Sequence, residues 1–404
     1  MSRPARHDVA VVGGGVVGTA CALALTELGL DVTLLEAVEP AHWSPQQRDL
    51  RVYALALDNV ALLTRLGVWD VVRATRAQRY RRMRVWDAAD ARELSFDADA
   101  LGRAELGWIV EHALLVDALW RRLAAVGVEV HCPTQVTAVT QDAAGVRLDL
   151  ADGGRIDARL IVAADGAKSA LRDMLGIDTQ SHDYQQRAVV CYVRAEYSHQ
   201  DTAWQRFLPG GPLALLPFAR NGVDEQVAAQ PDRDCSIVWT LPVAEAQRIT
   251  ALDDAAFARE LSLASDLRLG ALQATSARAA FALRRQLAAR YVQGRALLIG
   301  DAAHVVHPLA GQGVNLGLRD VAALARVVAA AQTRRTDFAT AARLARWARE
   351  RRSENTIAAH TFDAINRLYS NDAMLPTLLR GRLLGFANAL PPVTDTLWRR
   401  AGGL

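Results

Sequence analysis

A glycine-rich turn near the N-terminus constrains this chain more than any other feature of its sequence. The motif is Gly13-x-Gly15-x-x-Gly18, and it separates an apolar run, DVAVV at 8–12, from an apolar stretch at 19–28. Glycine permits a tight turn at the first position, approach of the backbone to a pyrophosphate at the second, and close helix–sheet packing at the third. These residues predict a strand, a turn and a helix whose N-terminus binds a dinucleotide.

A carboxylate follows the next apolar run in register with this motif. The run is DVTLL at 31–35, and Glu36 comes directly after it, eighteen residues beyond Gly18. An acid at this place can accept hydrogen bonds from the adenosine ribose hydroxyls and would repel a 2'-phosphate. The fingerprint by itself does not distinguish NAD from FAD.

Composition excludes several other classes of protein. The uncharged run 9–26 is long enough for a membrane helix, but glycines cost about 1 kcal/mol each in a helix interior and favour the strand–turn–helix interpretation. A formal net charge of +3 does not imply nucleic acid as a partner. The cysteines are far apart and form no CxxC pair, so we expect reduced thiols in a cytoplasmic protein and no metal site: Cys21, Cys132, Cys191 and Cys235.

The order of apolar runs predicts an α/β protein with a second, more antiparallel region. At 404 residues we expect two or three domains. A Rossmann-like domain should comprise 1–178 and 277–345, because the apolar strand at 159–163 belongs to it and a second apolar strand at 295–299 returns the chain to it. Alternating runs predict an inserted antiparallel β-sheet domain at 179–276, and 346–404 reads as a C-terminal helical segment.

Two further segments of the first domain have predicted roles. Residues 51–66 have the pattern of a helix. The arginines between 76 and 84 are expected to form a solvated or interdomain face, with contact to membrane phosphates as the alternative: Arg76, Arg79, Arg81, Arg82 and Arg84.

A second motif favours FAD over NAD. It is GDAAHxxHPLAGQGxNLGxxD at 300–320, directly after the apolar strand at 295–299. Asp301 stands at the carboxyl end of that strand, where a carboxylate can hold the ribityl hydroxyls of a flavin. Gly311 and Gly313 allow backbone to lie against a planar ring. The helix that follows would favour the anion of a reduced flavin through its N-terminal partial charge.

The third motif is Asp165-Gly166-Ala167-Lys168-Ser169-x-x-Arg172, after the strand at 159–163. Taken alone, it is more simply a turn followed by a helix cap at Ser169. The three motifs together are more specific than any one of them.

Their combination resembles the flavin aromatic hydroxylases built on the p-hydroxybenzoate hydroxylase fold. Within that group, DLRVYALALDNVALLTRLGVW at 49–69, LGWIVEH at 106–112 and HPLAGQGVNLGLRD at 307–320 are similar to the ubiquinone-biosynthesis hydroxylases that act on polyprenylphenols. The likeness covers nearly the whole chain.

The resemblance implies roles for individual residues. Arg51 would contact the FAD pyrophosphate, and Asp165 would lie near that pyrophosphate and the incoming nicotinamide nucleotide. Asp301 would hold the ribitol, and Pro308 would form the wall where oxygen meets C4a of the flavin. Either Glu111 or His112 would make a polar contact to the ribityl chain. The residues that would line the isoalloxazine ring follow Pro308 in the sequence: Gly311, Gln312, Gly313 and Asn315.

The reaction implied by the family is an aromatic hydroxylation. NAD(P)H would bind transiently and reduce FAD, oxygen would form a C4a-hydroperoxide, and an electron-rich phenol would take up its distal oxygen. Other flavoenzymes of the fold, an epoxidase or an isoprenoid reductase, are the alternatives. A noncatalytic FAD-bearing scaffold of a biosynthetic complex is the alternative from a different class.

The remaining expectations concern substrate, proton handling and partners. His307 either handles a proton, as a catalytic residue beside Pro308, or packs, whereas His304 is expected to be structural. The C-terminal helices could contact the inner face of a membrane, an oligomer is compatible with the sequence, and other ubiquinone-biosynthesis proteins are candidate partners. Apolar residues of the inserted sheet would line a pocket for the prenylated phenol and O2, with core packing as the alternative: Phe207, Leu213, Leu215, Leu216 and Trp239.

Overall fold

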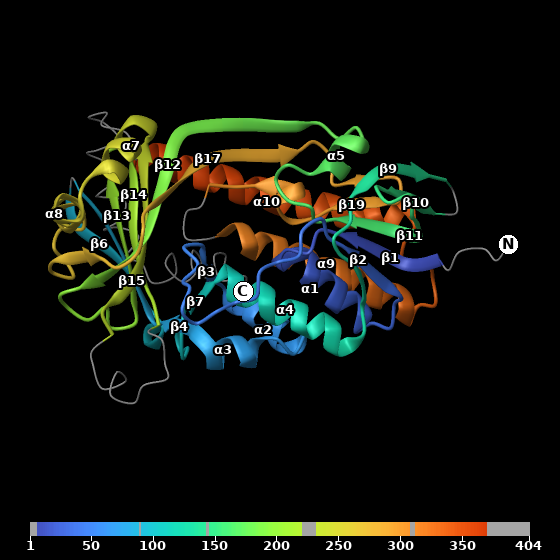
Figure 1. Ribbon diagram of the computed structural model, residues 1–404, viewed down its shortest axis with the longest axis horizontal. Helices are drawn as coiled ribbons and strands as arrows, with labels where there is room; N and C mark the ends of the chain where they lie inside the picture. The colour runs from blue at the N-terminus through green and yellow to red at the C-terminus, as the bar shows by residue number, and fades with distance from the viewer. Residues whose placement is uncertain (1–5, 89, 143–144, 220–231, 308–311, 370–404) are drawn as a thin grey trace.

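The computed structural model describes residues 6–88, 90–142, 145–219, 232–307 and 312–369. Its largest sheets lie at opposite ends of an elongated molecule, with a small sheet and several helices between them (Figure 1). The predicted α/β fold, with a Rossmann-like part and an antiparallel part, is confirmed.

The first sheet holds the N-terminal strand at its centre. Its main order is β18-β19-β11-β1-β2-β8, and β1 pairs in parallel with both β11 and β2. Central strands of this kind are buried on both faces, which is why they read as unbroken apolar runs. The strands are β1 (Arg6–Val12), β2 (Val32–Leu35), β8 (Glu129–His131), β9 (Val136–Gln141), β10 (Val146–Leu150), β11 (Arg155–Ala163), β18 (Val292–Gln293) and β19 (Ala296–Leu298).

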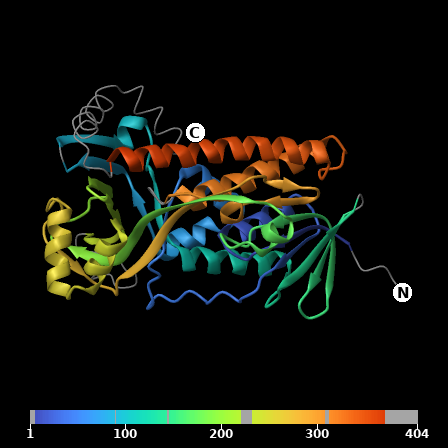
Figure 2. The same cartoon turned by 90° about the horizontal axis from the view of Figure 1, so that it is seen from above.

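Helices cover this sheet and bury one continuous core with it. α1 contacts both α4 and α9, and α10 lies along α9 on the outside (Figure 2). The helices of this part are α1 (Val16–Thr26), α4 (His112–Val126), α5 (Ala170–Met174), α9 (Gln312–Thr333) and α10 (Ala341–Tyr369), with the 3₁₀ turn η2 (Gly300–Ala302) before α9. The predicted C-terminal helical segment is thus described only as far as residue 369.

The segment at 51–66 is not one helix, as predicted, but a strand followed by a helix. β3 (Val52–Leu55) pairs with β7 (Gly107–Glu111), which also pairs with β4 (Ala77–Tyr80) to form the small sheet. The β-branched and aromatic residues at 52–53 favour the extended conformation. The helices beside this sheet are α2 (Leu57–Arg65) and α3 (Trp69–Arg76).

The antiparallel sheet takes strands from three separate parts of the chain. Its main order is β20-β17-β12-β15-β14-β13-β5-β6, and β16 pairs with β12. Its strands are β5 (Arg82–Asp87), β6 (Asp90–Asp97), β12 (Thr179–Ala195), β13 (Thr202–Leu208), β14 (Gly211–Pro217), β15 (Asp234–Pro242), β16 (Leu272–Ala274), β17 (Ala279–Ala288) and β20 (His304–Val305). The proposed domain limits at 178/179 and 276/277 stay a prediction, but hydrogen bonds of this sheet cross them.

One face of this sheet is covered by its own helices. α7 (Val243–Ala251) and α8 (Asp254–Ala264) bury a core against it, and the 3₁₀ turn η1 (Asp99–Leu101) follows β6. The opposite face packs against the small sheet, as the cluster of Tyr192 and Phe218 with Tyr80 and Ile109 shows. The antiparallel sheet therefore presents one face to the Rossmann-like part.

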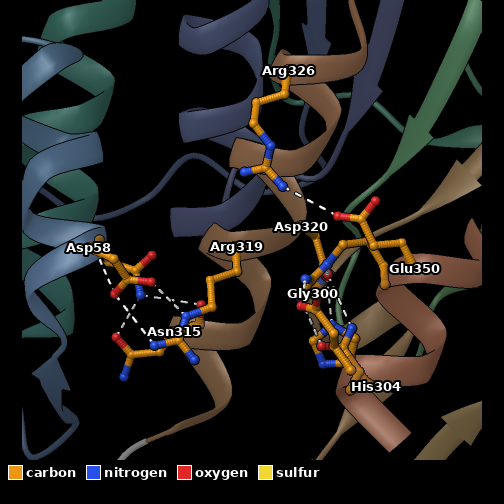
Figure 3. A network of polar contacts seen from close by, with 12 residues as sticks. Asp58, Gly300, His304, Asn315, Arg319, Asp320, Arg326 and Glu350 are labelled. Atoms are coloured by element: carbon orange, nitrogen blue, oxygen red, sulfur yellow. Dashed lines mark hydrogen bonds and ion pairs between the residues drawn. The ribbon is translucent and has the colours of Figure 1, made fainter. Parts of the chain in front are cut away.

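A buried carboxylate fixes the segment that connects the two parts after β19. Asp320 of α9 accepts hydrogen bonds from the amide of Gly300 at 3.1 Å and pairs with His304 Nε2 at 2.6 Å (Figure 3). Its other oxygen accepts from two residues of α10, Arg351 at 2.8 Å and Asn355 at 3.1 Å. Burial raises the pKa of Asp320, but His304 and Arg351 outweigh it, so the net pKa is below the usual value. The structural role predicted for His304 is confirmed.

We predict that Asp320→Asn lowers the free energy of unfolding by about 3 kcal/mol, because it leaves the buried guanidinium of Arg351 without its counter-charge. The matched control is Glu350→Gln, which removes only the exposed pair with Arg326 at 3.3 Å and should cost under about 1 kcal/mol. Denaturant titration at neutral pH measures both. Equal losses of unfolding free energy in Asp320→Asn and Glu350→Gln would contradict the stabilising role of the buried Asp320 carboxylate.

The effect of Asp320→Asn should also depend on pH with a definite sign. Because the pKa of Asp320 is lowered in the folded protein, its stabilisation is complete above the unfolded value near 3.9. This stabilisation is lost as the pH falls through the lower pKa that Asp320 has in the folded protein. The difference between wild type and variant should therefore narrow only in strong acid.

Candidate active site

The glycine turn has the geometry that the sequence predicts. Gly13 has a φ of +112°, and a Cβ there would lie 2.3 Å from the carbonyl oxygen of Ala164. A Cβ on Gly18 would lie 1.9 Å from the carbonyl oxygen of Gly13, so only glycine lets α1 approach the strand end. Both positions are thus closed to side chains for the reasons given above.

Gly15 is different, because a Cβ there would meet no atom within 4 Å. It is the N-cap of α1 and supplies no side chain to cap it. The first turn of α1 therefore keeps backbone N–H groups available to an anion, beside open space. This arrangement fits a pyrophosphate.

Glu36 is held directly against this turn. Its carboxylate accepts a hydrogen bond from the amide of Gly14 and, with its other oxygen, from the amide of Val38 at 3.0 Å. Trp120 of α4 donates to the carbonyl oxygen of Gly14 at 2.8 Å and so fixes the turn from the other side. The half-buried carboxylate stands at the end of β2, where the adenosine ribose would lie.

The turn after β11 is tied to the other two motifs. Ser169 caps α5 by accepting from the amide of Arg172 at 2.9 Å, which confirms the simple cap interpretation of that serine. Arg172 in turn donates to the carbonyl oxygens of Ala167 and Ala302, each at 3.2 Å. The third motif therefore contacts the second through a buried guanidinium.

Asp165 has one carboxylate oxygen without a partner. Its Oδ2 accepts from the amide of Leu171 at 3.1 Å, whereas the buried Oδ1 has no hydrogen-bond partner. Burial raises the pKa of this carboxyl, and the bonds from Ser169 and Leu171 oppose the effect. A buried orphan oxygen costs roughly 1–3 kcal/mol unless something else bonds to it. Asp165 thus fits a ligand with hydrogen-bond donors.

Asp301 and Arg51 come together from distant parts of the sequence. Asp301 lies in η2 and is exposed to solvent, yet protein atoms around it raise its pKa by desolvation. The nearby charges of His304, Arg51 and Arg284 act in the opposite direction. Arg51 immediately precedes β3 and is exposed. A carboxylate and a guanidinium are therefore presented to the same region.

Asp49 organises this region and was not identified from the sequence. Its carboxylate accepts from the amide of Arg51 at 2.9 Å and from the amide of Ala113, in the first turn of α4, at 3.0 Å. No local motif reveals such a cap, because the capped helix begins more than sixty residues later along the chain.

Glu111 and His112, the two alternatives for the ribityl contact, have different surroundings. Glu111 is fully buried and accepts from Arg76 at 3.0 Å, from Trp43 at 3.3 Å and from the amide of Asp49 at 3.1 Å. Burial raises its pKa, against the influence of Arg76. The prediction of a solvated position is thus wrong for Arg76, whose guanidinium is buried in this pair, and the interdomain alternative stays a prediction. His112 is half-buried and is bonded to Tyr53.

Asn315 joins α9 to the segment after β3. Its Oδ1 accepts from the amide of Ala56 at 2.9 Å and from Asn59 at 2.8 Å, and its Nδ2 donates to the carbonyl oxygen of Ala54 at 2.8 Å. Arg319, one turn later, pairs with Asp58 at 2.7 Å. Asn315 thus sets the position of the helix start.

The loop before α9 is only partly described. Pro308 and Gly311 lie outside the described residues, and Gln312 begins α9 without a described side chain. A Cβ on Gly313 would meet no atom within 4 Å, which leaves space beside the helix start. The lining roles of these residues stay predictions.

His307 is buried, with 1% of its surface exposed. Its ring meets the ring of Tyr184 edge to face at 4.9 Å, and neither ring nitrogen has a hydrogen-bond partner. Burial lowers its pKa to about 4, although Asp363 favours the charged form, so the ring is neutral near pH 7. The catalytic role of His307 stays a prediction.

The three motifs meet because their strands are neighbours. β1, β11 and β19 run in parallel side by side, so Gly13, Asp165 and Asp301 follow strand ends at one edge of the sheet. In open α/β sheets ligands bind outside this edge. The arrangement provides phosphate-binding amides, a ribose acceptor and two further carboxylates, which together fit FAD. Among the described residues, no cluster of His, Cys, Asp and Glu could hold a metal ion.

Comparison with known proteins agrees with this arrangement. Residues 6–358 match a family described as an FAD binding domain. The chain is 37% identical over 384 residues to the 3-demethoxyubiquinol 3-hydroxylase of Escherichia coli, with 95% of this chain and 94% of the relative covered. It is 36% identical over 397 residues to the ubiquinone hydroxylase UbiL of Rhodospirillum rubrum, with 98% and 89% covered.

A solved structure supports the fold. The crystal structure of HpxO from Klebsiella pneumoniae, complexed with FAD and uric acid, superposes with a TM-score of 0.73 at 20% identity, covering 98% of this chain and 96% of that one. The expected family resemblance and the expected cofactor are confirmed. FAD is the cofactor of this protein, and the chain belongs to the FAD-dependent monooxygenases of the ubiquinone-biosynthesis hydroxylase group.

Proposed function

We propose that this protein hydroxylates the aromatic ring of a polyprenylphenol in ubiquinone biosynthesis, using NAD(P)H and O2. The observation that carries the proposal is the convergence of three strand ends, with the partnerless Oδ1 of Asp165 and the exposed Asp301, opposite an apolar face of the antiparallel sheet. Bound FAD supplies the redox chemistry that accepts a hydride and activates dioxygen.

The residues around the cofactor bind and orient it in this proposal. The free backbone amides in the first turn of α1, which Gly15 leaves open, and the side chain of Arg51 hold the pyrophosphate, and Glu36 accepts from the ribose hydroxyls. Asp301 holds the ribityl hydroxyls, and Asp165 bonds to the nucleotide side. Backbone and side chains of the loop and helix start line the ring: Pro308, Gly311, Gln312, Gly313 and Asn315.

The sheet residues expected to line a substrate pocket divide between its two faces. Leu213, Leu215 and Trp239 belong to the core under α7 and α8, so for these three residues the core-packing alternative is confirmed and the pocket-lining one is wrong. Phe207 and Leu216 lie on the opposite face, where Leu216 packs with residues of the small sheet and Phe207 packs with Val85 and Leu94 of β5 and β6. Alternation along a strand explains the division, because neighbouring side chains face opposite ways.

The face toward the Rossmann-like part is apolar where the substrate would lie. Val190 of β12 pairs across the sheet with Val238 of β15, and both belong to a cluster with Leu50, Tyr184 and Leu283. Val238 is only half-buried. A half-buried apolar surface beside the cofactor edge suits an uncharged ring with a hydrocarbon chain better than a carboxylated phenol.

The function is tested by turnover of the FAD-loaded protein with a polyprenylated phenol, NADH or NADPH, and air. We expect substrate-dependent oxidation of the nicotinamide and a product that is heavier by one oxygen atom. Asp301→Ala should weaken FAD binding roughly 10- to 100-fold and lose the yellow colour, whereas Glu350→Gln should retain it. Oxidation that yields only hydrogen peroxide with every phenol tested would contradict the proposal, and no oxidation of the nicotinamide at all would favour a scaffold.

The proposed apolar face predicts a change in substrate affinity. Val238→Gln should raise the KM for the polyprenylated phenol about 10-fold, with FAD affinity unchanged, because an amide replaces apolar surface against the chain. Leu263→Gln, at a side chain that is 66% exposed on α8, is the control and should have no effect. Steady-state kinetics with phenols of different chain length measure this. An unchanged KM in Val238→Gln would exclude this face.

Peripheral contact with a membrane is part of the proposal. Among the described residues, no helix is long and apolar enough to span a bilayer. Arg346 and Arg349 are exposed on α10 and form no ion pair with any described residue, and Arg334 and Arg335 are exposed just before it. These arginines suit anionic headgroups. Oligomerisation and contact with other biosynthesis proteins stay predictions.

Replacing both Arg346 and Arg349 with Glu should weaken binding to anionic vesicles at least about 10-fold. Flotation with vesicles of phosphatidylglycerol and phosphatidylcholine measures this, and pure phosphatidylcholine vesicles provide the uncharged comparison. The control is Glu350→Gln, which changes a charge on the same helix without adding a repelling carboxylate, and it should not weaken binding. Wild-type protein that does not float with anionic vesicles would refute the membrane contact.

A further inference from the structure

A tyrosine and a histidine form a hydrogen-bonded pair at the cofactor edge. Tyr53 lies in β3, and its hydroxyl is 2.8 Å from Nδ1 of His112, the first residue of α4. The two rings meet edge to face at 5.6 Å and 82°. The backbone enforces the pairing, because the amide of His112 donates to the carbonyl oxygen of Arg51 at 2.9 Å, just beyond the β3–β7 ladder.

The protonation states of the pair follow from its surroundings. Burial and the charge of Arg51 lower the pKa of His112 to about 4, with Asp49 opposing them. Burial raises the pKa of Tyr53 above its usual value. Near pH 7 the pair is therefore a neutral imidazole and a neutral phenol. Arg51 also hydrogen-bonds to the phenol oxygen of Tyr53, and we assign the phenol O–H as the donor to Nδ1. In this arrangement the imidazole proton lies on Nε2.

The other ring nitrogen has no protein partner. No described residue bonds to Nε2 of His112, whereas both carboxylate oxygens of neighbouring Glu111 are occupied by protein donors. The charges of Arg51 and Asp301 both act on Tyr53. The Tyr53–His112 pair therefore lies close to these two residues, which face the cofactor. His112 is thus the free donor at this place, and Glu111 is not.

We propose that Tyr53 is a positioning residue for FAD binding, which acts by holding His112 as the tautomer that donates from Nε2 to the flavin side chain. The proposal deepens the cofactor site and does not depend on which phenol is hydroxylated. Tyr53 itself does not touch the cofactor. Its effect on FAD should therefore disappear when His112 is absent.

A double-mutant cycle on FAD affinity tests this dependence. The measured quantity is the Kd of FAD for the apoprotein, from quenching of flavin fluorescence. Tyr53→Phe should weaken binding about 5- to 10-fold, and His112→Ala should weaken it at least as much. The double variant should be no weaker than His112→Ala alone, since the two residues act as one unit. Independent, multiplying effects would overturn the proposal.

Two further variants separate positioning from general damage. Tyr80→Phe removes the hydroxyl of another buried tyrosine in the same small sheet and should leave the Kd unchanged. His112→Gln supplies an amide donor that needs no tautomer, so it should restore most of the affinity and become insensitive to Tyr53→Phe. An effect of Tyr80→Phe equal to that of Tyr53→Phe, or no recovery in His112→Gln, would overturn the proposal. The visible flavin spectrum and thermal unfolding of the apoproteins are recorded alongside.

The outcome is distinguishable from failure of the proposed function. The cycle is measured on FAD binding without substrate, so absence of phenol hydroxylation leaves its result intact. Conversely, an additive cycle would remove the role of Tyr53 and leave turnover by the wild-type protein unaffected.

Discussion

Parallel pairing of β11 with both β1 and β19 is the interaction on which the site depends. The amide of Ala164 donates to the carbonyl oxygen of Val12 at 2.7 Å, and the amide of Ile299 donates to that of Ala163 at 3.0 Å. These bonds align the carboxyl ends of the three strands. Segments separated by well over a hundred residues thereby place their polar groups at one edge. The close approach at Gly13 and Gly18 then lets α1 begin directly above that edge. A shift of one strand by one residue would reverse which side chains face the helices.

The second constraint is the attachment of α9 to its neighbours. Asn315 and Arg319 join α9 to the segment at 54–59, and Asp320 joins it to the loop at 300–304 and to α10. The start of α9 is thus held from both sides by buried polar groups. Buried groups of this kind stabilise one arrangement strongly, because any other leaves them unpaired.

Much of the site could be predicted from short motifs, because backbone geometry dictates residue type there. Gly13 needs a positive φ, which favours glycine. Glu36 could be predicted because it directly follows the strand next to the glycine motif. The helix cap by Asp49, the Tyr53–His112 pair and the Arg76–Glu111 pair could not be identified, because the partners that matter are distant in sequence. The helix predicted at 51–66 failed for a related reason: β3 exists through pairing with β7, whose residues begin at 107.

The lining of the substrate face was predicted only in part. Apolar residues alternate along β14 and β15, and both faces of the sheet are apolar, so composition gave no indication of which set faces the cofactor. Only the position of α7 and α8 decides it.

The mixed origin of the antiparallel sheet has a consequence for how the protein can be divided. β5 pairs with β13, although the predicted domain limit at 178/179 separates them in the sequence. β17 pairs with β20, and both strands lie beyond the predicted limit at 276/277. Neither part is a contiguous module that could be excised or exchanged with its edges intact. Residues 179–276 excised alone would expose the unpaired backbone edges of β12 and β13 to solvent. In a chimera of two relatives, the pairs β12–β17 and β5–β13 would join side chains from different parents, so the whole set of strands should be exchanged together.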